Sequence, residues 1–239
     1  MKVIITMAGQ GSRFKKVGYK CPKHEIQVGG KSLFNWSISS LSDFFDETFY
    51  FIVRKNNYSS AYLRKEINSL GIKDYKIFVL EEMTDGQADT VMKVMTNIDD
   101  DEGVLIYNID THIDPKNVLK SEIVSNDGSV MLFDAKGSHW SFAKIDDDEN
   151  KIIEMAEKIP ISSLGSVGLY YFDKASDYIK AFNESSNDIK QKYGEIYIAP
   201  LYNNLIDSNK IIKPVIISSQ YFIPLGTPEE LENFKTNLG

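Results

Sequence analysis

A glycine-rich segment that follows a short apolar run is the part of this sequence best suited to chemistry. The segment reads Met-Ala-Gly-Gln-Gly-Ser-Arg-Phe over residues 7–14. Gly9 and Gly11 lack a Cβ atom, so the backbone can turn sharply and point consecutive N–H groups at phosphate oxygens. Between Gln10 and His24 the chain has one Arg, four Lys and no Asp or Glu, although its net charge is −7. This local reversal of charge predicts an anion-binding loop; the alternative is a solvated basic turn.

The same segment differs from two widespread phosphate-binding motifs. A P-loop requires Gly-Lys-Ser/Thr after four intervening residues, and a dinucleotide-binding loop requires a third glycine where this chain has Phe14. Neither an ATPase loop nor a NAD-binding loop is therefore expected here.

A second chemical group lies at the end of the apolar run 104–109, where Asn108 and Asp110 are found. In an open parallel sheet, ligands bind beyond the carboxyl ends of the strands. Asp110 and the glycine-rich loop are therefore expected at one edge of the sheet, where a carboxylate can hold Mg²⁺ together with phosphate oxygens. Alternatively, Asp110 only begins a turn. Asp114, which precedes Pro115, is the better candidate for a helix cap.

A third candidate is the polar segment that precedes an expected helix and contains Thr84, Gly86 and Gln87. The amide of Gln87 could hydrogen-bond a base edge, and Gly86 would let a flat ring approach the backbone. The alternative is that Thr84 or Asp85 simply caps the helix.

Two candidates lie in the second half of the chain. Lys158, next to Glu157, could hold the phosphate of an acceptor, or the two could form a surface ion pair. His139 and Trp140 bring aromatic rings near the expected cleft. Trp140 could equally belong to the core, and His139 has no partner in the sequence that would make it catalytic.

The elements that must position these residues form an alternating pattern. Apolar runs predict strands over 3–7, 48–53, 76–80, 104–109 and 129–133, and helical spacing predicts helices over 33–45, 58–70 and 87–94. Strands that alternate with helices predict an α/β fold with a mostly parallel, doubly covered, Rossmann-like sheet.

The second half has shorter strand-like runs and predicts a small β-rich insertion on the acceptor side. Strands are expected over 141–145, 151–155 and 167–172, helices over 178–182 and 197–206, and a late strand over 215–217 and 221–222. Thr227 and Pro228 fit the start of a last helix. We expect a single domain over 1–239, with a nucleotide-binding half (1–135) and an acceptor-binding half (136–239).

Composition excludes several classes of protein. The chain has 42% hydrophobic residues and one cysteine, Cys21, so a disordered chain, an internal disulfide and a multi-cysteine zinc site are not expected. Acidic residues outnumber basic ones by 34 to 27, which argues against nucleic acid as a partner. No run is long enough for a signal-peptide core or a membrane span, so the expected location is the cytoplasm. Whether the protein forms a homodimer is an open question.

Taken in order, these motifs resemble the sugar-phosphate nucleotidyltransferases of the glycosyltransferase-A-like fold. The resemblance runs from about residue 3 to residue 234 and includes Pro-Lys at 22–23, Glu-Lys at 157–158 and Leu-Gly-Thr-Pro-Glu-Glu at 225–230. The first motif is most similar to the branch found in bacterial capsule and surface-polysaccharide clusters. The resemblance implies that a phosphorylated acceptor attacks the α-phosphorus of a nucleoside triphosphate. It further implies CTP as the favoured nucleotide, phosphoglutamine or a sugar phosphate as the acceptor, and Mg²⁺ as the cofactor.

The resemblance also implies roles for particular residues. Arg13 would hold the departing phosphates, Lys23 would neutralise charge at the α-phosphate, and Asp110 would bind Mg²⁺. Acceptor binding would fall to Lys158, with Glu157, His139 and Trp140 nearby. The residues implied in nucleotide binding are Met7, Ala8, Gly9, Gly11, Ser12, Arg13, Lys23, Thr84, Gly86 and Gln87.

The chain departs from the family pattern at two positions. Pro224 stands where family members carry a second acidic metal ligand, so Asp114 or Glu195 could substitute, or Asp110 and phosphates hold the metal alone. His24 stands where many members have a second proline. Two other functions therefore stay open: a glycosyltransferase that uses nucleotide-sugars, and a nucleotide-binding regulator without catalysis.

Overall fold

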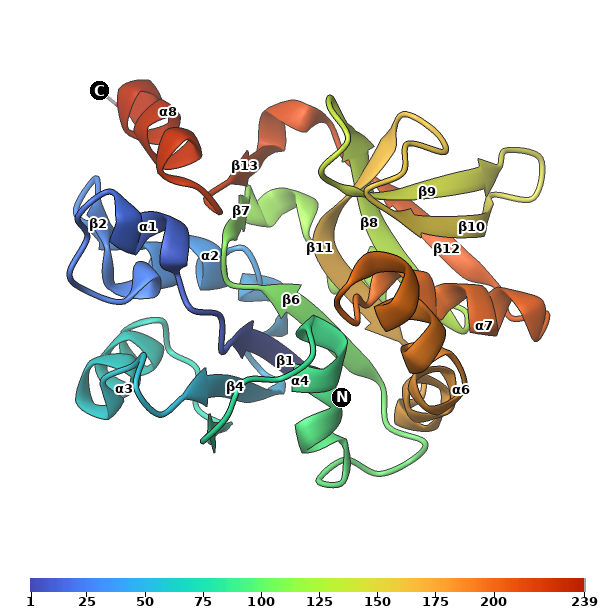
Figure 1. Cartoon of the computed structure of the whole chain (residues 1–239), viewed down its shortest axis with the longest axis horizontal. Coiled ribbons are helices and arrows are strands. Elements are labelled where there is room, and N and C mark those ends of the chain that lie inside the picture. The colour runs from blue at the N-terminus through green and yellow to red at the C-terminus, as the bar shows by residue number, and fades with distance from the viewer. Residues whose placement is uncertain (239) are drawn as a thin grey trace.

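A nine-stranded sheet forms the centre of the computed structural model, which describes residues 1–238 (Figure 1). Its main path runs in the order β10-β9-β11-β6-β1-β4-β5, and β8 pairs with both β11 and β12. Within these residues, no helix combines the length and the apolar character that crossing a membrane requires.

The N-terminal part of the sheet is parallel. β1 (Lys2–Met7) lies between β4 (Thr48–Arg54) and β6 (Val104–Asn108), and β5 (Tyr75–Leu80) adds the edge strand. β-Branched and aromatic residues dominate these strands, as expected for strands buried on both faces. All four carboxyl ends meet at one edge of the sheet.

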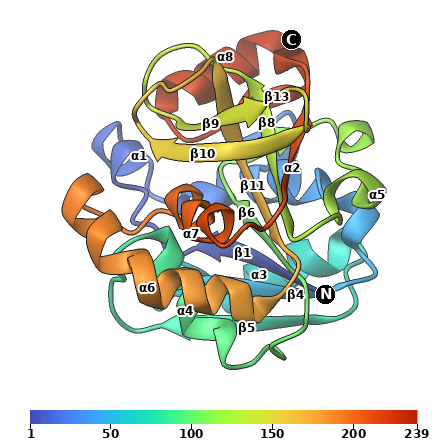
Figure 2. The same ribbon diagram turned by 90° about the vertical axis from the view of Figure 1, so that its right-hand side faces the viewer.

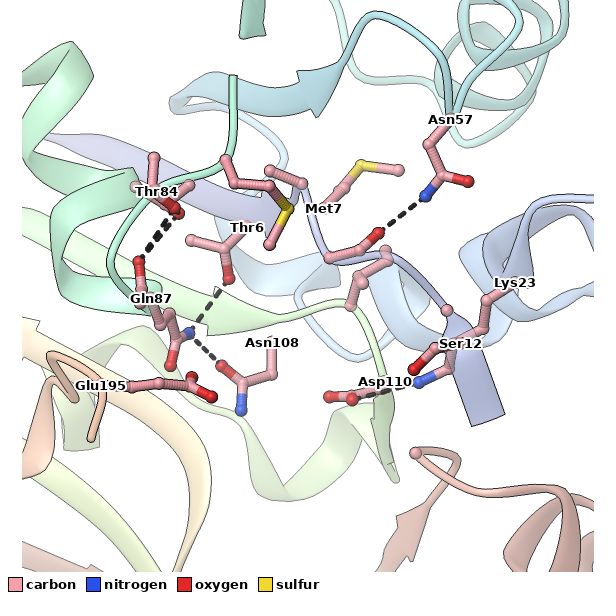
Figure 3. A pocket seen from close by; sticks show the side chains of 18 of the residues that line it. Thr6, Met7, Ser12, Lys23, Asn57, Thr84, Gln87, Asn108, Asp110 and Glu195 are labelled. Carbon is pink, nitrogen blue, oxygen red and sulfur yellow. Dashed lines mark hydrogen bonds and ion pairs between the residues drawn. The ribbon is translucent and has the colours of Figure 1, made fainter. Parts of the chain in front are cut away.

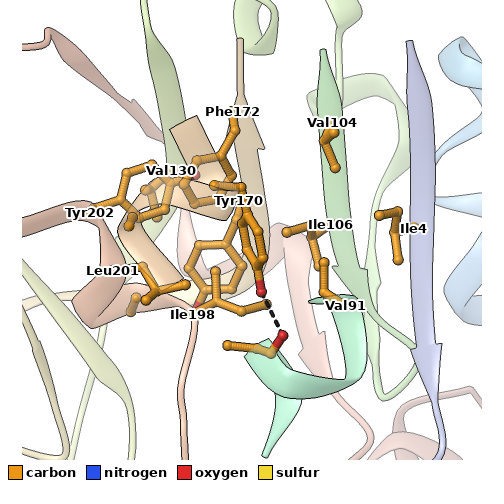
Figure 4. Close-up of a cluster of buried hydrophobic side chains, with 14 of the residues drawn as sticks. Ile4, Val91, Val104, Ile106, Val130, Tyr170, Phe172, Ile198, Leu201 and Tyr202 are labelled. Carbon is orange, nitrogen blue, oxygen red and sulfur yellow. Dashed lines mark hydrogen bonds between the residues drawn. The ribbon is translucent and has the colours of Figure 1, made fainter. Parts of the chain in front are cut away.

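Helices cover both faces of the sheet, and alternate side chains of each strand enter separate core clusters. Val3 and Ile5 of β1 face α2 (Leu33–Ser39) and α3 (Ser60–Ser69). Ile4 faces the opposite cluster, which also includes Val91 of α4 (Gln87–Met95), Tyr170 and Tyr202 (Figure 4). α6 (Ala175–Tyr193) and α7 (Tyr202–Asp207) pack on that second face as well (Figure 2).

The part of the sheet formed by the second half of the chain is largely antiparallel. β11 (Leu164–Phe172) runs antiparallel to β6 and to β8 (Gly128–Asp134), and β9 (Ser141–Asp146) forms a hairpin with β10 (Lys151–Glu157). β12 (Ile212–Ile216) is parallel to β8. The expected α/β class with a mostly parallel central sheet is confirmed, and β9 and β10 form the expected β-rich insertion.

Several element boundaries differ from the sequence-based expectation. The helix expected over 33–45 ends at Ser39, because the backbone leaves the helical conformation at Leu41, where φ is −96° and ψ is 25°; a 3₁₀ turn, η2 (Ser42–Phe44), follows. The helix expected over 178–182 is part of the longer α6. The segment 197–206 contains η4 (Ala199–Leu201) and α7, and the late strand splits into β12 and β13 (Phe222–Pro224) with η5 (Ser219–Tyr221) between them.

The C-terminal segment returns to the glycine-rich loop. β13 pairs with β7 (Thr111–Ile113), and Leu225 N–H donates to the carbonyl of Asp110 at 2.8 Å. α8 (Pro228–Leu238) begins as expected, because Thr227 and Glu230 exchange hydrogen bonds as a capping box.

The remaining elements are α1 (Ser12–Lys16), η1 (Lys23–Glu25), β2 (Gln27–Val28), β3 (Lys31–Ser32), η3 (Pro115–Asn117) and α5 (Lys120–Ile123).

A short backbone contact joins the start of α4 to the segment after α6. Ile196 N–H donates to Asp85 O at 2.8 Å, and Ala88 N–H donates to Ile196 O at 3.0 Å. Gly86 lies between them with a φ of 139°, and an added Cβ would come within 2.6 Å of the Ile196 nitrogen and oxygen. Only glycine therefore allows the two segments to meet here.

We expect Gly86→Ala to destabilise the protein more than Gly194→Ala. Gly194 also has a positive φ, 84°, but an added Cβ would meet nothing within 4 Å. The backbone conformation alone should cost about 1–2 kcal/mol at either site, and the clash at Gly86 should add about 1–3 kcal/mol. Urea unfolding of the two variants measures the difference. Equal losses of unfolding free energy would contradict the close contact between Gly86 and Ile196.

Candidate active site

A cavity of about 630 Å³ lies at the carboxyl ends of the parallel strands (Figure 3). This volume is typical of small-molecule sites. The glycine-rich loop, the segment before α4, the end of β6 and the segment after α6 all line it. The lining residues discussed below are Thr6, Met7, Ala8, Gly9, Gly11, Ser12, Arg13, Phe14, Lys23, His24, Asn57, Glu82, Thr84, Asp85, Gly86, Gln87, Asn108, Asp110 and Glu195.

The glycine-rich loop is held from both ends. Gly11 adopts a left-handed conformation with a φ of 60°, and α1 begins at the next residue. The buried ring of Phe14 anchors α1 in the core. On the other side, the Asn57 side chain donates from Nδ2 to Gly9 O at 2.7 Å. These contacts fix the path of the loop, so its backbone can meet a ligand without reorganising.

Lys23 and Asp110 form an ion pair across the cavity. Lys23 Nζ lies 3.1 Å from Asp110 Oδ2 and 5.4 Å from the centre of the Phe14 ring. Burial would raise the pKa of Asp110, but the charge and hydrogen bond of Lys23, with help from the Arg13 charge, lower it instead. Asp110 is therefore ionised at neutral pH. Its side chain is 41% exposed, so the carboxylate stays open to the cavity.

Arg13 and His24 lie near this pair, and they differ in exposure and in charge. Arg13 lines the cavity with an exposed side chain, and among the described residues it forms no ion pair. His24 is buried, and burial together with the charge of Lys23 lowers its pKa to about 4. His24 is thus neutral at pH 7, and the cations in the cavity lining are Arg13 and Lys23.

The first residue of α4, Gln87, lines the cavity, and its side-chain nitrogen is hydrogen-bonded within the protein. Gln87 Nε2 donates to Thr6 Oγ1 at 3.0 Å and also to Asn108 Oδ1 (Figure 3). This fixes the orientation of the amide. The residue at the N-cap of α4 is Gly86, so neither Thr84 nor Asp85 caps this helix.

Glu157 and Lys158 lie outside the cavity lining, at the end of β10. Burial raises the pKa of Glu157, whose carboxylate accepts a hydrogen bond from the Ser141 hydroxyl. Lys158 has a positive φ of 56° and donates to the Tyr197 hydroxyl at 2.6 Å. That hydrogen bond, with the negative charges of Glu157 and Glu195, raises the pKa of Lys158. A strained lysine held in this way has a defined position.

His139 and Trp140 also lie away from the cavity lining. Trp140 packs edge-on against Phe133 and Phe222, and its indole N–H donates to Lys136 O at 3.0 Å. The ring of His139 lies 4.3 Å from the ring of Trp140. This pair covers the end of the β9 hairpin, next to the backbone bond from Lys158 N–H to Trp140 O.

Asp110 is the residue best placed to hold a metal ion. Within residues 1–238, no three His, Cys, Asp or Glu side chains gather to bind a metal by themselves. Mg²⁺ commonly uses one or two carboxylates and completes its shell with phosphates and water. An ionised, open Asp110 in a cavity with room for phosphates and water fits that requirement. Of the two alternative ligands expected from the sequence, Glu195 lines the same cavity, whereas Asp114 lies outside the lining and caps η3 through its bond to Lys116 N–H. Pro224, which pairs with Thr111, has no side-chain atom that could bind a metal.

Sequence reasoning missed two residues that organise the site, Asn57 and Thr6, and it named Asn108 without giving it a role. Asn57 follows β4, Thr6 lies near the end of β1, and Asn108 ends β6. The rule that ligands bind at the carboxyl ends of parallel strands could have identified all of them. Their particular partners, Gly9 and Gln87, lie far along the chain and carry no local signal.

The chain matches the family model described as nucleotidyl transferase over residues 2–211. None of the curated proteins compared with the chain matches it. A nucleoside-diphosphate-sugar pyrophosphorylase from Vibrio cholerae RC9 is similar over 99% of this chain and 100% of its own, with 36% identity and a TM-score of 0.89.

Two more distant structures share the fold. The inositol-1-phosphate CTP transferase from T. maritima is 15% identical, with a TM-score of 0.76 over 99% of this chain and 94% of its own. A UTP-bound UGPase from Acinetobacter baumannii is 13% identical, with a TM-score of 0.73 over 100% of this chain and 93% of its own. From the family match and the Vibrio structure together, we conclude that the chain belongs to the nucleotidyl transferase family of sugar-phosphate nucleotidyltransferases.

Proposed function

We propose that this protein transfers CMP from CTP to a small phosphorylated acceptor and releases pyrophosphate, in the biosynthesis of capsular or surface polysaccharide. The observation that carries the reaction is the Lys23–Asp110 pair, which joins the glycine-rich loop to the end of β6 inside one cavity. The nucleotide-binding half would be residues 1–135 and the acceptor-binding half residues 136–239.

The glycine-rich loop suits a triphosphate. Backbone N–H groups of the loop, from Ala8 to Ser12, would contact its phosphates, and the free guanidinium of Arg13 would hold the departing pyrophosphate. The amide of Gln87, fixed by Thr6 and Asn108, would meet the base beside Gly86. Met7 and Thr84 would complete the nucleotide contacts.

The choice of CTP rests on the resemblance to the capsule branch and on the chemistry of the lining. Glu82, on the segment before α4, brings a carboxylate to the cavity. A carboxylate accepts hydrogen bonds from the amino group of cytosine, whereas uracil and thymine present a carbonyl oxygen at that position. This supports cytosine over the other pyrimidines.

The chemistry needs no protein nucleophile. An oxygen of the acceptor phosphate, already ionised at pH 7, attacks the α-phosphorus, and the bond between that phosphorus and the bridging oxygen to the β-phosphate breaks. Negative charge grows on the α-phosphate and on the leaving pyrophosphate. Lys23 would stabilise the charge on the α-phosphate, and Arg13 would stabilise the charge on the pyrophosphate. Catalysis would therefore come from positioning the substrates and from stabilising negative charge. Lys158 would hold the acceptor phosphate, with Glu157 behind it; His139 and Trp140 would bound the acceptor side.

Mg²⁺ would be held by Asp110 and by phosphate oxygens, and when bound it supplies charge neutralisation to the triphosphate. The Lys23–Asp110 pair has a further consequence. Anionic phosphates in the cavity compete with Asp110 for the ammonium of Lys23, and a cation at Asp110 favours that exchange. Lys23 would therefore leave Asp110 and contact the α-phosphate when the nucleotide binds.

The reaction class and nucleotide preference are tested by pyrophosphate release with each of the four ribonucleoside triphosphates and a panel of phosphorylated acceptors, with and without Mg²⁺. We expect release with CTP at least tenfold above UTP, and loss of release when EDTA removes the metal. A higher rate with UTP would contradict the assignment of CTP. Transfer of sugar from a nucleotide-sugar without pyrophosphate release would identify a glycosyltransferase instead.

We expect Lys23→Ala to lower kcat on the order of 10²–10³-fold while weakening CTP binding far less, because the charge of Lys23 acts mainly as the α-phosphorus is attacked. Lys23→Arg should also be slow, since a planar guanidinium does not replace a compact ammonium. Steady-state kinetics and calorimetry with CTP separate the two effects.

Lys20→Ala is the matched control, because Lys20 is an exposed lysine of the same loop that lies outside the cavity lining. Circular dichroism reports whether each variant folds. If kcat of folded Lys23→Ala stays within about threefold of the wild type, Lys23 has no part in the mechanism.

A further inference from the structure

A buried polar side chain of the cavity lining reaches the glycine-rich loop from a different strand. Asn57 lies in the turn after β4, and its side chain is buried. Its Nδ2 donates to Gly9 O at 2.7 Å, and Figure 3 shows Asn57 directed at the loop. A carbonyl can only accept, so it is the NH₂ end of the amide that faces the loop.

The hydrogen bonds of the loop backbone leave its acceptors and its donors in different states. Gly11 O accepts from two N–H groups of α1, at 3.1 and 3.2 Å, and Gly9 O accepts from Asn57. Within residues 1–238, the N–H groups of Gly9, Gln10 and Gly11 donate to no protein group. The carbonyls of both glycines are therefore occupied, whereas three consecutive N–H groups are available to an anion.

The peptide group between Gly9 and Gln10 depends on Asn57 for its orientation. Gly9 is exposed and has no Cβ atom, so this group can rotate at little cost. In a trans peptide the C=O and the N–H point in opposite directions, so a rotation would exchange the sides that they face. Among the described residues, Asn57 provides the one side chain that donates to a carbonyl of residues 8–12.

The turn that carries Asn57 is itself fixed by backbone contacts. Asn57 N–H donates to Arg54 O, the last residue of β4, at 2.9 Å. Two residues further on, the Ser59 hydroxyl caps α3 by accepting from Tyr62 N–H at 3.3 Å. The sheet and α3 therefore hold the amide of Asn57 at a defined place beside the loop.

We infer that Asn57 is a positioning residue for the pyrophosphate part of the nucleotide. By binding the Gly9 carbonyl, it keeps a repelling oxygen away from the β- and γ-phosphates and keeps the N–H groups of the loop in the arrangement that binds them. The inference rests on the proposed function, because it assumes that the loop binds the triphosphate. It adds that a residue outside the loop motif sets the affinity for pyrophosphate, and that binding of the nucleoside monophosphate does not depend on it.

The test measures, by calorimetry, the binding of magnesium pyrophosphate and of CMP as separate ligands. All four nucleoside triphosphates contain the same pyrophosphate part, so that result does not depend on which base the site prefers. Asn57→Ala removes the donor, and Asn57→Asp keeps the size but presents a carboxylate that can only accept. The matched control is Asn56→Ala, because Asn56 is the exposed neighbour outside the cavity lining.

We expect Asn57→Ala to weaken binding of magnesium pyrophosphate about 10-fold and to change binding of CMP less than about twofold. Asn57→Asp should weaken pyrophosphate binding at least as much, since its charge repels both the Gly9 carbonyl and the ligand. Asn56→Ala should change neither. A merely structural role would weaken both ligands together. Equal weakening of the two by folded Asn57→Ala, or none, would overturn the inference.

A measurement on the wild type keeps the inference testable if the Asn57 variants do not fold. In ¹⁵N–¹H spectra, magnesium pyrophosphate should shift the backbone amide signals of Gly9, Gln10 and Gly11 more than CMP does. The side-chain amide signals of Asn57 should move little, because its bond to Gly9 persists. Unmoved loop amides would refute the inference, and a large shift of the Asn57 side chain would show direct contact with the ligand instead.

Pyrophosphate release with the four nucleoside triphosphates separates this inference from the proposed function. Selective loss of pyrophosphate binding in Asn57→Ala, without turnover by the wild type on any acceptor, would support the role of Asn57 and refute the transferase activity. Turnover by the wild type with an unchanged KM for the nucleotide in Asn57→Ala would support the transferase and refute the role of Asn57.

Discussion

The pairing of β1 between β4 and β6 is the constraint on which the site depends. Parallel ladders bring the carboxyl ends of these three strands to one edge, where each delivers a polar group: Thr6 from β1, Asn57 after β4 and Asn108 from β6. Because both faces of the strands are buried under helices, a one-residue shift in register would move each apolar side chain into the opposite core cluster, where it does not fit. The burial that stabilises the fold therefore also fixes the polar groups that orient the loop and the amide of Gln87.

The charges in the cavity are neutralised in individual ion pairs, and the cavity as a whole is not neutral. The loop after β1 is rich in lysine, yet Arg13 and Lys23 are the basic residues of that loop that line the cavity. Lys23 neutralises Asp110 in the structure as it stands, so neither charge is left unpaired in the cavity. In the proposed reaction, an anion and a cation would replace this pairing and make Lys23 available to the α-phosphate.

The two halves of the chain meet through backbone contacts at the cavity itself. The segment after α6 bonds to both sides of Gly86, and the C-terminal segment bonds to Asp110 through Leu225. Each contact ties a residue of the first half of the chain to an element of the second half. The two halves therefore cannot separate without breaking backbone hydrogen bonds.

By itself, the sequence determined the features that depend on neighbouring residues. Apolar periodicity identified the central strands, glycine spacing and basic residues identified the loop at 7–14, and a capping pattern identified the start of α8. The rule for parallel sheets then predicted that this loop and Asp110 share an edge, because that rule needs only the order of strands.

Only the tertiary structure decided which polar groups meet. Asn57 reaches Gly9, Gln87 reaches Thr6, and Lys23 reaches Asp110 across 87 positions of the chain. It also left Glu157, Lys158, His139 and Trp140 outside the cavity lining and brought Glu195 into it. These outcomes depend on how helices and hairpins pack on the sheet, and local sequence patterns carry no information about partners so far apart.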